Sequence, residues 1–322
     1  MTVSHHPAAR AAVRGVGGVR GDSGAPSVDV AASRPRPRPW RWALTVVLVA
    51  VAVQLVAFLA TNPNFGWDVV GEYLFFPTVL SGLGMSVLLA VIAMIAGSLF
   101  GVVLAMLQLS DYLPGRWAAR LYIGVFRAVP PLVQLIFWFN LGFLMPKISV
   151  AIPFGPELAS WSTNSLITPL SAAIIGLTLH EAAYMAEIIR SGITSVDQGQ
   201  RDAAKAVGFT PWQTFAKVVM PQAMRVILPP FGNQFIATVK GTSLVSVIAM
   251  SDLLFSVQTI ADRTYQIVPM LIVACLWYLV VVSILTVFQR LLERRYGRGY
   301  DAAPAARQTK LRPRFLGRGG GN

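Results

Sequence analysis

The sequence predicts an all-α membrane protein, a polytopic bundle of about six transmembrane helices with both termini in the cytoplasm. Composition is the first reason: 55% of the 322 residues are hydrophobic and 13% are charged, about half the fraction usual in soluble domains. The second is a set of apolar stretches that reach the ~20 residues needed to span a bilayer. The third is the distribution of basic residues, which give a formal net charge of +13 and gather in alternate connections.

The N-terminal segment, residues 1–41, is rich in Arg, Ala, Gly, Pro and Ser and shows no apolar periodicity. Near its end Arg34, Arg36 and Arg38 alternate with prolines, a composition that cannot bury a core. We therefore expect a disordered, basic cytoplasmic tail. An arm that binds nucleic acid is disfavoured, because no aromatic residues are interleaved with the arginines.

Six stretches are long and apolar enough to cross a membrane as helices, and they lack the alternation of a membrane β-barrel. They cover about 43–60, 79–108, 122–145, 167–189, 226–248 and 268–289. The lead-in to the first stretch is far longer than that of a signal peptide, which favours an uncleaved anchor over a cleaved signal. Residues 42–78 are thus expected to form an extra N-terminal helix and an outer loop.

The basic residues indicate which connections lie inside, since the cytoplasmic segments of membrane proteins are enriched in Lys and Arg. Nearly all of the 27 lysines and arginines lie in the two tails and in the connections 109–121 and 190–225. The alternate connections hold only Lys147 and Arg263. These alternate connections are 61–78, 146–166 and 249–267. We therefore expect them to be short outward loops, and we place both tails, including the basic tail 291–322, in the cytoplasm.

Within the second stretch, Gly97 and Gly101 form a G-x-x-x-G pair. Two glycines about one helical turn apart leave a flat strip on which a second helix can lie backbone to backbone. The pattern predicts close helix packing at this point.

The residue types that carry most enzyme chemistry are scarce. Cys275 is the single cysteine, which excludes a disulfide framework, a cysteine zinc site and an iron–sulfur cluster. Two of the three histidines are His5 and His6, so His180 alone is left for a triad or a metal site. No G-x-x-x-x-G-K-[ST] loop is present to hold a nucleotide. We expect no catalytic residue, no metal and no cofactor bound by this chain.

Two carboxylates fall in the fourth stretch, and carboxylates within a membrane are candidates for proton transfer. Glu187 precedes Arg190 by three residues, a helical ion-pair spacing near the cytoplasmic end of the span. This spacing favours an ion pair over a proton relay for Glu187. Glu181 lies deeper in the span and receives no assignment from the sequence.

The connection 190–225 is the longest internal one and the most informative. Gln200–Val207 can form a short helix with small faces, and Gly208 would end it as a C-terminal glycine. Thr210 and Pro211, which follow, match a helix N-cap with proline at the first helical position. A second amphipathic run, 212–219, would end at Pro221. The pattern predicts a compact helix–turn–helix, a rigid knob for a cytoplasmic partner, and a plain interfacial loop is the alternative.

Three parts of the chain carry a recognisable pattern. They are the loop Asp202-Ala203-Ala204…Gly208…Val218–Pro221, the span residues Ala183–Ile193, and the run Phe126–Pro130 with Gln134. The loop keeps the spacing of E-A-A, three residues, G, nine residues and I-x-L-P, and the span follows A-Y-x-A-E-I-x-R-x-G-I. Over about residues 79–290 the chain resembles the polar amino acid (histidine/glutamine-type) permease subunits of ATP-binding-cassette (ABC) importers. Asp202 in place of Glu and Gly241 in place of Asp are departures from the family pattern.

The resemblance implies a function, partners and a location. Residues 79–290 would form the permease transmembrane domain, in the plasma membrane of a bacterium, with 190–225 as its coupling loop. The expected partners are cytoplasmic ATPase subunits that use ATP, a second identical or different permease subunit, an extracytoplasmic substrate-binding protein and membrane lipid. The ATPase-coupling residues would be Gly199, Gln200, Asp202, Ala203, Ala204, Gly208 and Pro221. The chain would translocate polar amino acids and would not itself be an enzyme.

The fifth stretch carries the expected translocation path. It begins with Leu228–Gly232, whose two prolines predict a broken start with carbonyl groups unpaired beside a cavity. The path residues would be Asn233 and Lys240 on one helix face, with Gln234, Thr238 and Thr242 on the adjoining flank. A lysine in a span costs ~2.5–3.5 kcal/mol on insertion scales, so Lys240 should have a partner.

Two other functional classes stay open at the level of the sequence. A proton-coupled secondary transporter that uses Glu181 or Glu187 would move solute under a proton gradient without any ATPase. A helical membrane scaffold would leave uptake unchanged when it is deleted.

We predict that residue 160 lies outside the membrane and residue 200 in the cytoplasm. In a chain whose Cys275 is replaced by Ser, Ser160→Cys should react with a membrane-impermeant maleimide in intact cells. Gln200→Cys should react only after permeabilisation. Labelling of Gln200→Cys from outside, or protection of Ser160→Cys, would contradict the topology drawn from the charges.

Overall fold

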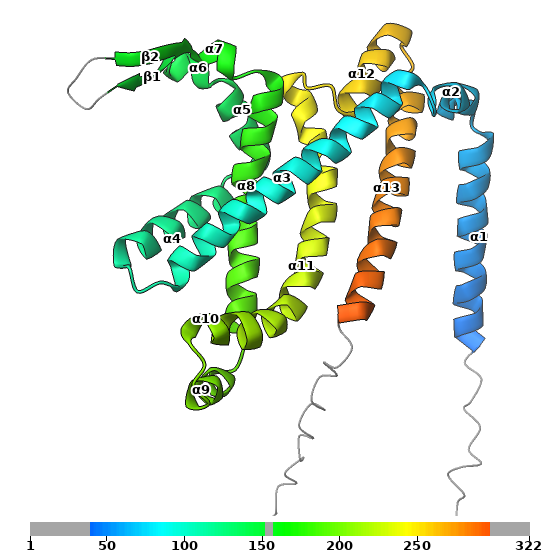
Figure 1. Cartoon of the computed structure of the whole chain (residues 1–322). Coiled ribbons are helices and arrows are strands. Elements are labelled where there is room, and N and C mark those ends of the chain that lie inside the picture. The colour runs from blue at the N-terminus through cyan, green and yellow to red at the C-terminus, as the bar shows by residue number, and fades with distance from the viewer. Residues whose placement is uncertain (1–38, 152–156, 297–322) are drawn as a thin grey trace, which may run out of the picture. The chain divides into compact units, whose positions relative to one another are not determined.

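The computed structural model describes residues 39–151 and 157–296 (Figure 1). The described helices are α1 (Pro39–Thr61), α2 (Trp67–Tyr73), α3 (Pro77–Leu109), α4 (Leu113–Ala128), α5 (Pro131–Phe139), α6 (Leu141–Leu144), α7 (Thr163–Leu166), α8 (Pro169–Thr194), α9 (Gln198–Ala206), α10 (Pro211–Thr214), α11 (Met220–Gly241), α12 (Leu253–Thr264) and α13 (Ile267–Tyr296). Short helical turns are η2 (Pro63–Phe65), η3 (Phe215–Val219) and η4 (Thr242–Ile248), and the strands are β1 (Lys147–Ala151) and β2 (Glu157–Ser162). Most of the two expected tails, 1–38 and 297–322, lies outside the described residues.

Four of these helices, α1, α3, α8 and α13, are long and apolar enough to cross a membrane. The bent pair α4–α5, and the bent pair of Pro211–Ile248 with α12, bring the number to six if each pair counts as one span. The predicted membrane-embedded helix bundle is confirmed. The described residues divide into two units, one made of α1 (Pro39–Thr61) and one that begins at Asn62 and includes the other described elements.

The second unit is built on the crossing of α3 and α8 (Figure 1). A Cβ atom at Gly97 would lie 2.7 Å from Glu181 Cβ, and one at Gly101 would lie 2.6 Å from Met185 Cβ. Only glycine permits backbones this close, so the predicted packing at the G-x-x-x-G pair is confirmed. Small residues of α8 line the contact and are fully buried, namely Ala182, Ala183 and Ala186.

The expected third span, 122–145, is wrong as a single helix. α4 takes up most of the expected loop before it, and α5 turns away from α4 by 102° at Pro130–Pro131. Prolines have no N–H group, so the last carbonyl groups of α4 lose helical partners. The side chain of Gln134 supplies hydrogen-bond donors at this bend, because its Nε2 donates to Phe126 O at 2.9 Å and to Val129 O at 2.8 Å. The buried glutamine thereby holds the bend.

The predicted breaks around the fifth span are also wrong. Pro221 does not end the run 212–219, because helical turns continue from α10 through η3 into α11. Pro221 lies in the first turn of α11, where a missing N–H is tolerated. Pro229–Pro230 lie inside α11 instead of marking a broken start. The break comes after α11, where the helix tightens into η4 and Ala249 takes a left-handed conformation with φ of 57°.

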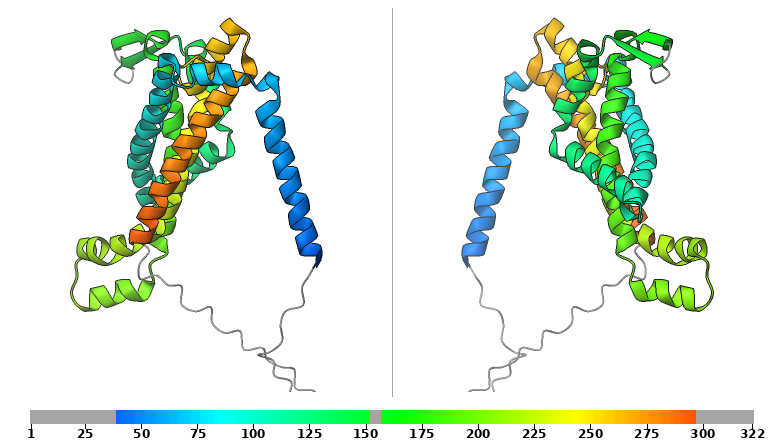
Figure 2. Two further views of the ribbon diagram at one scale, coloured as in Figure 1. Left: turned by 90° about the vertical axis from the view of Figure 1, so that its right-hand side faces the viewer. Right: turned by 90° about the vertical axis from the view of Figure 1, so that its left-hand side faces the viewer.

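The connections expected to be short outward loops contain ordered structure, which corrects that prediction. Residues 61–78 include η2 and α2, and residues 249–267 contain α12. In 146–166 the strands β1 and β2 pair antiparallel. The alternation of Ile148 and Val150 with polar residues has the period of a strand, a signal that a search for apolar helices does not use. The β1–β2 hairpin lies at the opposite end of the bundle from α9 and α10 (Figure 2).

We predict that Gly101→Ala lowers the melting temperature of the purified protein by several degrees. The new methyl group would meet Met185 Cβ and the backbone of Ala186, and overpacking of this kind typically costs about 1–3 kcal/mol. Gly84→Ala is the matched control on the same helix, since nothing lies within 4 Å of its Cβ position. Thermal unfolding in detergent followed by size-exclusion chromatography measures both. Equal melting temperatures for the two variants would contradict the packing role.

Candidate functional site

A buried polar pair links α8 and α11 in the middle of the bundle. Glu181 is only 3% exposed, because its Cβ lies against Gly97 of α3. Gln234 Nε2 donates a hydrogen bond to Glu181 Oε2 at 3.0 Å. Thr238, one turn further along α11, is also buried and donates from Oγ1 to Gln234 O at 2.8 Å. The structure thus gives Glu181, which the sequence left unassigned, a partner on another helix.

The expected path residues of α11 separate onto different sides of the helix. Gln234 and Thr238 lie with Glu181. Asn233 instead lies toward α13, where its Oδ1 accepts from Gln289 Nε2 at 3.0 Å. Thr242 is fully buried and donates to Val239 O at 2.8 Å. The five residues therefore do not form one continuous surface within this chain.

Lys240 is exposed, and within the described residues of this chain it makes no ion pair. The expected partner of Lys240 is therefore not supplied by the described residues of this chain and stays a prediction. An ammonium group at lipid depth is costly. The exposed face of α11 at Lys240 consequently needs water or another polar surface beside it.

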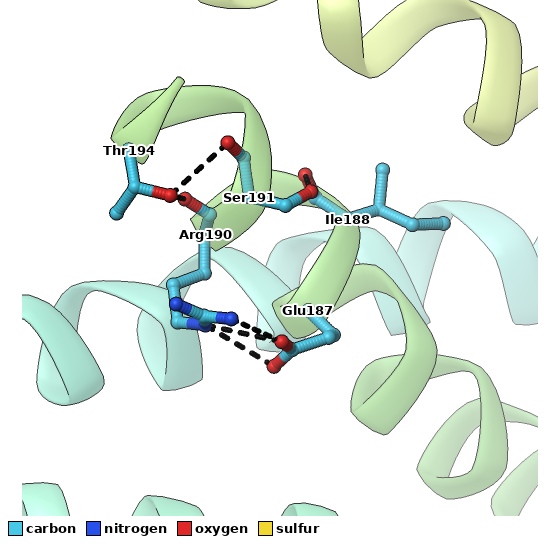
Figure 3. Close-up of polar contacts among 5 residues, drawn as sticks. All are labelled: Glu187, Ile188, Arg190, Ser191 and Thr194. Atoms are coloured by element: carbon cyan, nitrogen blue, oxygen red, sulfur yellow. Dashed lines mark hydrogen bonds and ion pairs between the residues drawn. The ribbon is translucent and has the colours of Figure 1, made fainter. Parts of the chain in front are cut away.

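The predicted ion pair of α8 is confirmed (Figure 3). Arg190 Nε donates to both carboxylate oxygens of Glu187 at 3.2 Å, and Arg190 Nη2 also donates to Glu187 Oε1. The guanidinium of Arg127 on α4 lies 5.3 Å from the ring centre of Tyr184, one turn before Glu187. Two arginines therefore surround the Glu187 region, and the carboxylate is held as an anion in an ion pair.

The connection 190–225 forms a helical hairpin made of α9, α10 and η3 (Figure 2). Asp197 caps α9 by accepting from the Gly199 N–H at 2.7 Å. The predicted end of this helix is confirmed, because Gly208 follows α9 with φ of +84°, a conformation that favours glycine. The predicted start of the next helix is also confirmed: Thr210 and Gln213 form a reciprocal capping box at α10.

The exposed face of this hairpin carries most of the residues expected to bind an ATPase. These are Gly199, Gln200, Asp202, Ala203 and Gly208, all of them exposed, and Pro221 is exposed nearby in the first turn of α11. Asp202 accepts from Gln198 Nε2 at 3.0 Å and lies 3.9 Å from Lys205 Nζ. Ala204 is the exception, since it is only 5% exposed and packs inside the hairpin. Ala204 is therefore not part of the exposed face that would meet an ATPase.

The sequence analysis did not single out two large apolar side chains of this hairpin. Val207 and Trp212 flank the turn between α9 and α10 and are each 72% exposed. An exposed tryptophan and valine on the same hairpin as the exposed, acidic Asp202 offer both apolar contact and a hydrogen-bond acceptor. Such a combination is typical of a docking surface for another protein.

Comparisons with known proteins agree with the resemblance seen in the sequence. Residues 97–298 match the family described as "Binding-protein-dependent transport system inner membrane component". The arginine transport system permease protein ArgU of Corynebacterium glutamicum is 40% identical over 248 residues, covering 77% of each chain. The glutamate/aspartate import permease protein GltK of Escherichia coli O157:H7 is 34% identical, covering 72% of this chain and 98% of GltK.

A solved structure has the same arrangement of helices. It is described as a crystal structure of an amino acid ABC transporter with histidines. Its matching chain is 34% identical, with a TM-score of 0.58, and the match covers 69% of this chain and 95% of that one.

Proposed function

The chain belongs to the family of binding-protein-dependent transport system inner membrane components, and from this we propose that it carries polar amino acids delivered by a substrate-binding protein, as the permease subunit of an ABC importer. The observation that carries the proposal is the family match over 97–298, which contains both the polar pair of α8 and α11 and the cytoplasmic hairpin. The chain is a multi-pass membrane protein and a transport subunit rather than an enzyme.

The proposed assembly has partners on both sides of the membrane. Members of this family work with separate ATPase subunits and a binding protein, so ATP is used by a partner and not by this chain. We infer a pair of permease subunits, identical or different, with cytoplasmic ATPases on one side and an extracytoplasmic binding protein on the other. The location we infer is the plasma membrane of a bacterium, because the named relatives are bacterial.

The alternative of a proton-coupled secondary transporter is not supported. The relatives are subunits of ATP-driven systems. Glu187 is paired with Arg190, and this ion pair stabilises the charged form of its carboxylate. Glu181 accepts a hydrogen bond from Gln234, which gives this buried carboxyl group a structural role.

We infer that the cytoplasmic hairpin is the element that couples ATP use to the membrane. Nucleotide-driven closure of the ATPases must reach the permease through a contact that moves as a unit. The hairpin suits this role because both helix starts are capped, Gly208 gives a tight turn, and Asp202 is exposed at its surface. Val207 and Trp212 add exposed apolar surface at the turn of the same hairpin.

We infer that the exposed side of α11 at Lys240 borders the translocation path or the second permease subunit. An exposed lysine in a span has a stable place only beside water or a polar surface. Gln234 and Thr238 lie on the neighbouring side of the same helix, next to Glu181. A substrate in the path would therefore meet the ammonium group of Lys240, while Gln234 and Thr238 support the buried side of the same helix.

The whole proposal predicts uptake that needs ATP and every partner. In vesicles containing this chain, its ATPase, its binding protein and any second permease subunit, labelled amino acid should accumulate only with ATP. A panel of arginine, glutamate, glutamine and histidine covers the polar classes. The chain alone under a proton gradient should move none of them. Uptake by the chain alone would overturn the proposal.

For the path, we predict that Lys240→Met lowers uptake per assembled complex by about tenfold or more, a loss of at least ~1.4 kcal/mol of stabilisation. The substitution removes the charge and keeps the length of the side chain. Lys147→Met serves as a control outside the spans, because Lys147 is also exposed but lies on β1. Uptake is normalised to the amount of assembled complex in the vesicles. Normal uptake by Lys240→Met would exclude Lys240 from the path.

For the hairpin, we predict that Gly208→Val and Asp202→Ala leave the subunit inserted but weaken docking of the ATPase or uncouple it. Valine is strained at φ of +84°, and removal of Asp202 loses a charge-assisted contact worth typically ~1.5–3 kcal/mol. Gly124→Val and Asp111→Ala are matched controls, since Gly124 has open space around it and Asp111 is exposed away from the hairpin. Co-purification of the ATPase and ATP hydrolysis stimulated by the binding protein are measured. Parent values for both hairpin variants would remove the hairpin from the coupling mechanism.

A further inference from the structure

A cavity of about 400 Å³ lies between η4, α12 and the first turns of α13. It is at the end of the second unit opposite the hairpin of α9, α10 and η3, the end that the charge distribution places outside (Figure 1). Its volume falls within the ~300–1,000 Å³ usual for small-ligand sites. None of the expected path or coupling residues lines it, so the cavity is separate from the two sites described above.

A single charged residue, Asp262, is among the described residues that line the cavity. Asp262 is exposed, so its carboxylate can be reached by a ligand, and Gln258, one turn earlier on the same face of α12, is also exposed. Among the described residues neither side chain has a hydrogen bond or an ion pair. Arg263 is not part of the lining, since successive residues of a helix do not face each other. The cavity therefore presents a carboxylate without a counter-ion in the described chain.

The two hydroxyl groups of the lining can only accept further hydrogen bonds. Thr259 Oγ1 already donates to Phe255 O at 2.9 Å, and Ser246 Oγ already donates to Ser243 O at 2.8 Å. A hydroxyl group has one proton to donate and two lone pairs that accept, so only lone pairs are left. Together with the carboxylate, these oxygens suit a ligand group that is positively charged and carries several N–H donors.

Much of the remaining lining is apolar. Ile267 and Leu271, one turn apart on α13, are exposed there, and Phe255 contributes from α12. An apolar body attached to the cationic group would thus find a surface of matching character.

We propose that this cavity binds an organic cation, a primary ammonium group on a short apolar body, with Asp262 as its counter-ion. The hydroxyl oxygens of Ser246 and Thr259 accept its remaining N–H groups. The ligand is either an amino acid with a basic side chain or an aliphatic diamine, which share this chemistry. The proposal concerns binding by this chain alone and holds whether or not the chain carries amino acids.

The test uses the full chain in nanodiscs of phosphatidylcholine, with 4-fluorobenzylamine as probe. Fluorine relaxation of the probe reports binding, and empty nanodiscs give the background from the lipid. We expect the parent protein to bind 4-fluorobenzylamine and not 4-fluorobenzyl alcohol, which has nearly the same shape without the charge. Because each variant loses an acceptor, Asp262→Asn should bind the cation at least about tenfold more weakly and Thr259→Val at least about twofold more weakly. Glu72→Gln, which removes an exposed carboxylate of α2 outside the lining, should bind like the parent.

A second arm separates the two sources of the cation. Cadaverine, which is lysine without its carboxyl group, should displace 4-fluorobenzylamine from the parent protein in either case. If lysine displaces the probe as well, the native occupant is an amino acid with a basic side chain. If lysine does not, it is a diamine.

Four results overturn the proposal. They are equal binding by parent, Asp262→Asn and Thr259→Val, equal binding of the neutral alcohol, no displacement by cadaverine, and no binding of 4-fluorobenzylamine at millimolar concentration. Size-exclusion profiles of each variant identify any that fail to fold, and Thr259→Val keeps the test valid if Asp262→Asn is one of them.

Discussion

The close approach of α3 and α8 depends on two glycines, and the second unit is arranged around that contact. Lipid tails are as apolar as the helices, so spans are held together by close van der Waals contact rather than by the hydrophobic effect. Gly97 and Gly101 supply the flat surface that meets the small residues of α8. This contact fixes the rotation of α8 about its axis and turns Glu181 toward α11, where Gln234 meets the buried carboxylate.

The prolines of the bundle show why a break in a span needs a donor from elsewhere. At Pro130–Pro131 the chain turns, and Gln134 donates to the carbonyl groups that the prolines leave without partners. At Pro229–Pro230 the helix continues, so a pair of prolines does not by itself set a bend. Water is absent from the bilayer core, so freed carbonyl groups must be satisfied by side chains of this kind.

Hydropathy and glycine signals were enough to predict the helix bundle, the packing at Gly97 and Gly101 and the end of α9 at Gly208, because each depends on local sequence. The bend after α4 could not be predicted in the same way, since proline alone does not distinguish a turn from a tolerated kink. The inward position of Ala204 depends on how α9 packs against η3, which no local pattern encodes. The partner of Glu181 was missed because Gln234 lies 53 residues away along the chain.

The hairpin and the buried polar pair are joined by the same two helices. α8 ends where the hairpin begins, and helical turns run from the hairpin directly into α11. Near this junction Gly192 of α8 lies so close to Ile227 and Ala223 of α11 that a Cβ atom would not fit. Further into the membrane the hydrogen bond from Gln234 to Glu181 joins these helices again. Arg201 adds a bond from α9 to the last turn of α8, at Ile193 O. A force on the hairpin therefore acts on α8 and α11 together. Because the two helices are in close contact at Gly192, they respond by moving together rather than by separating from each other.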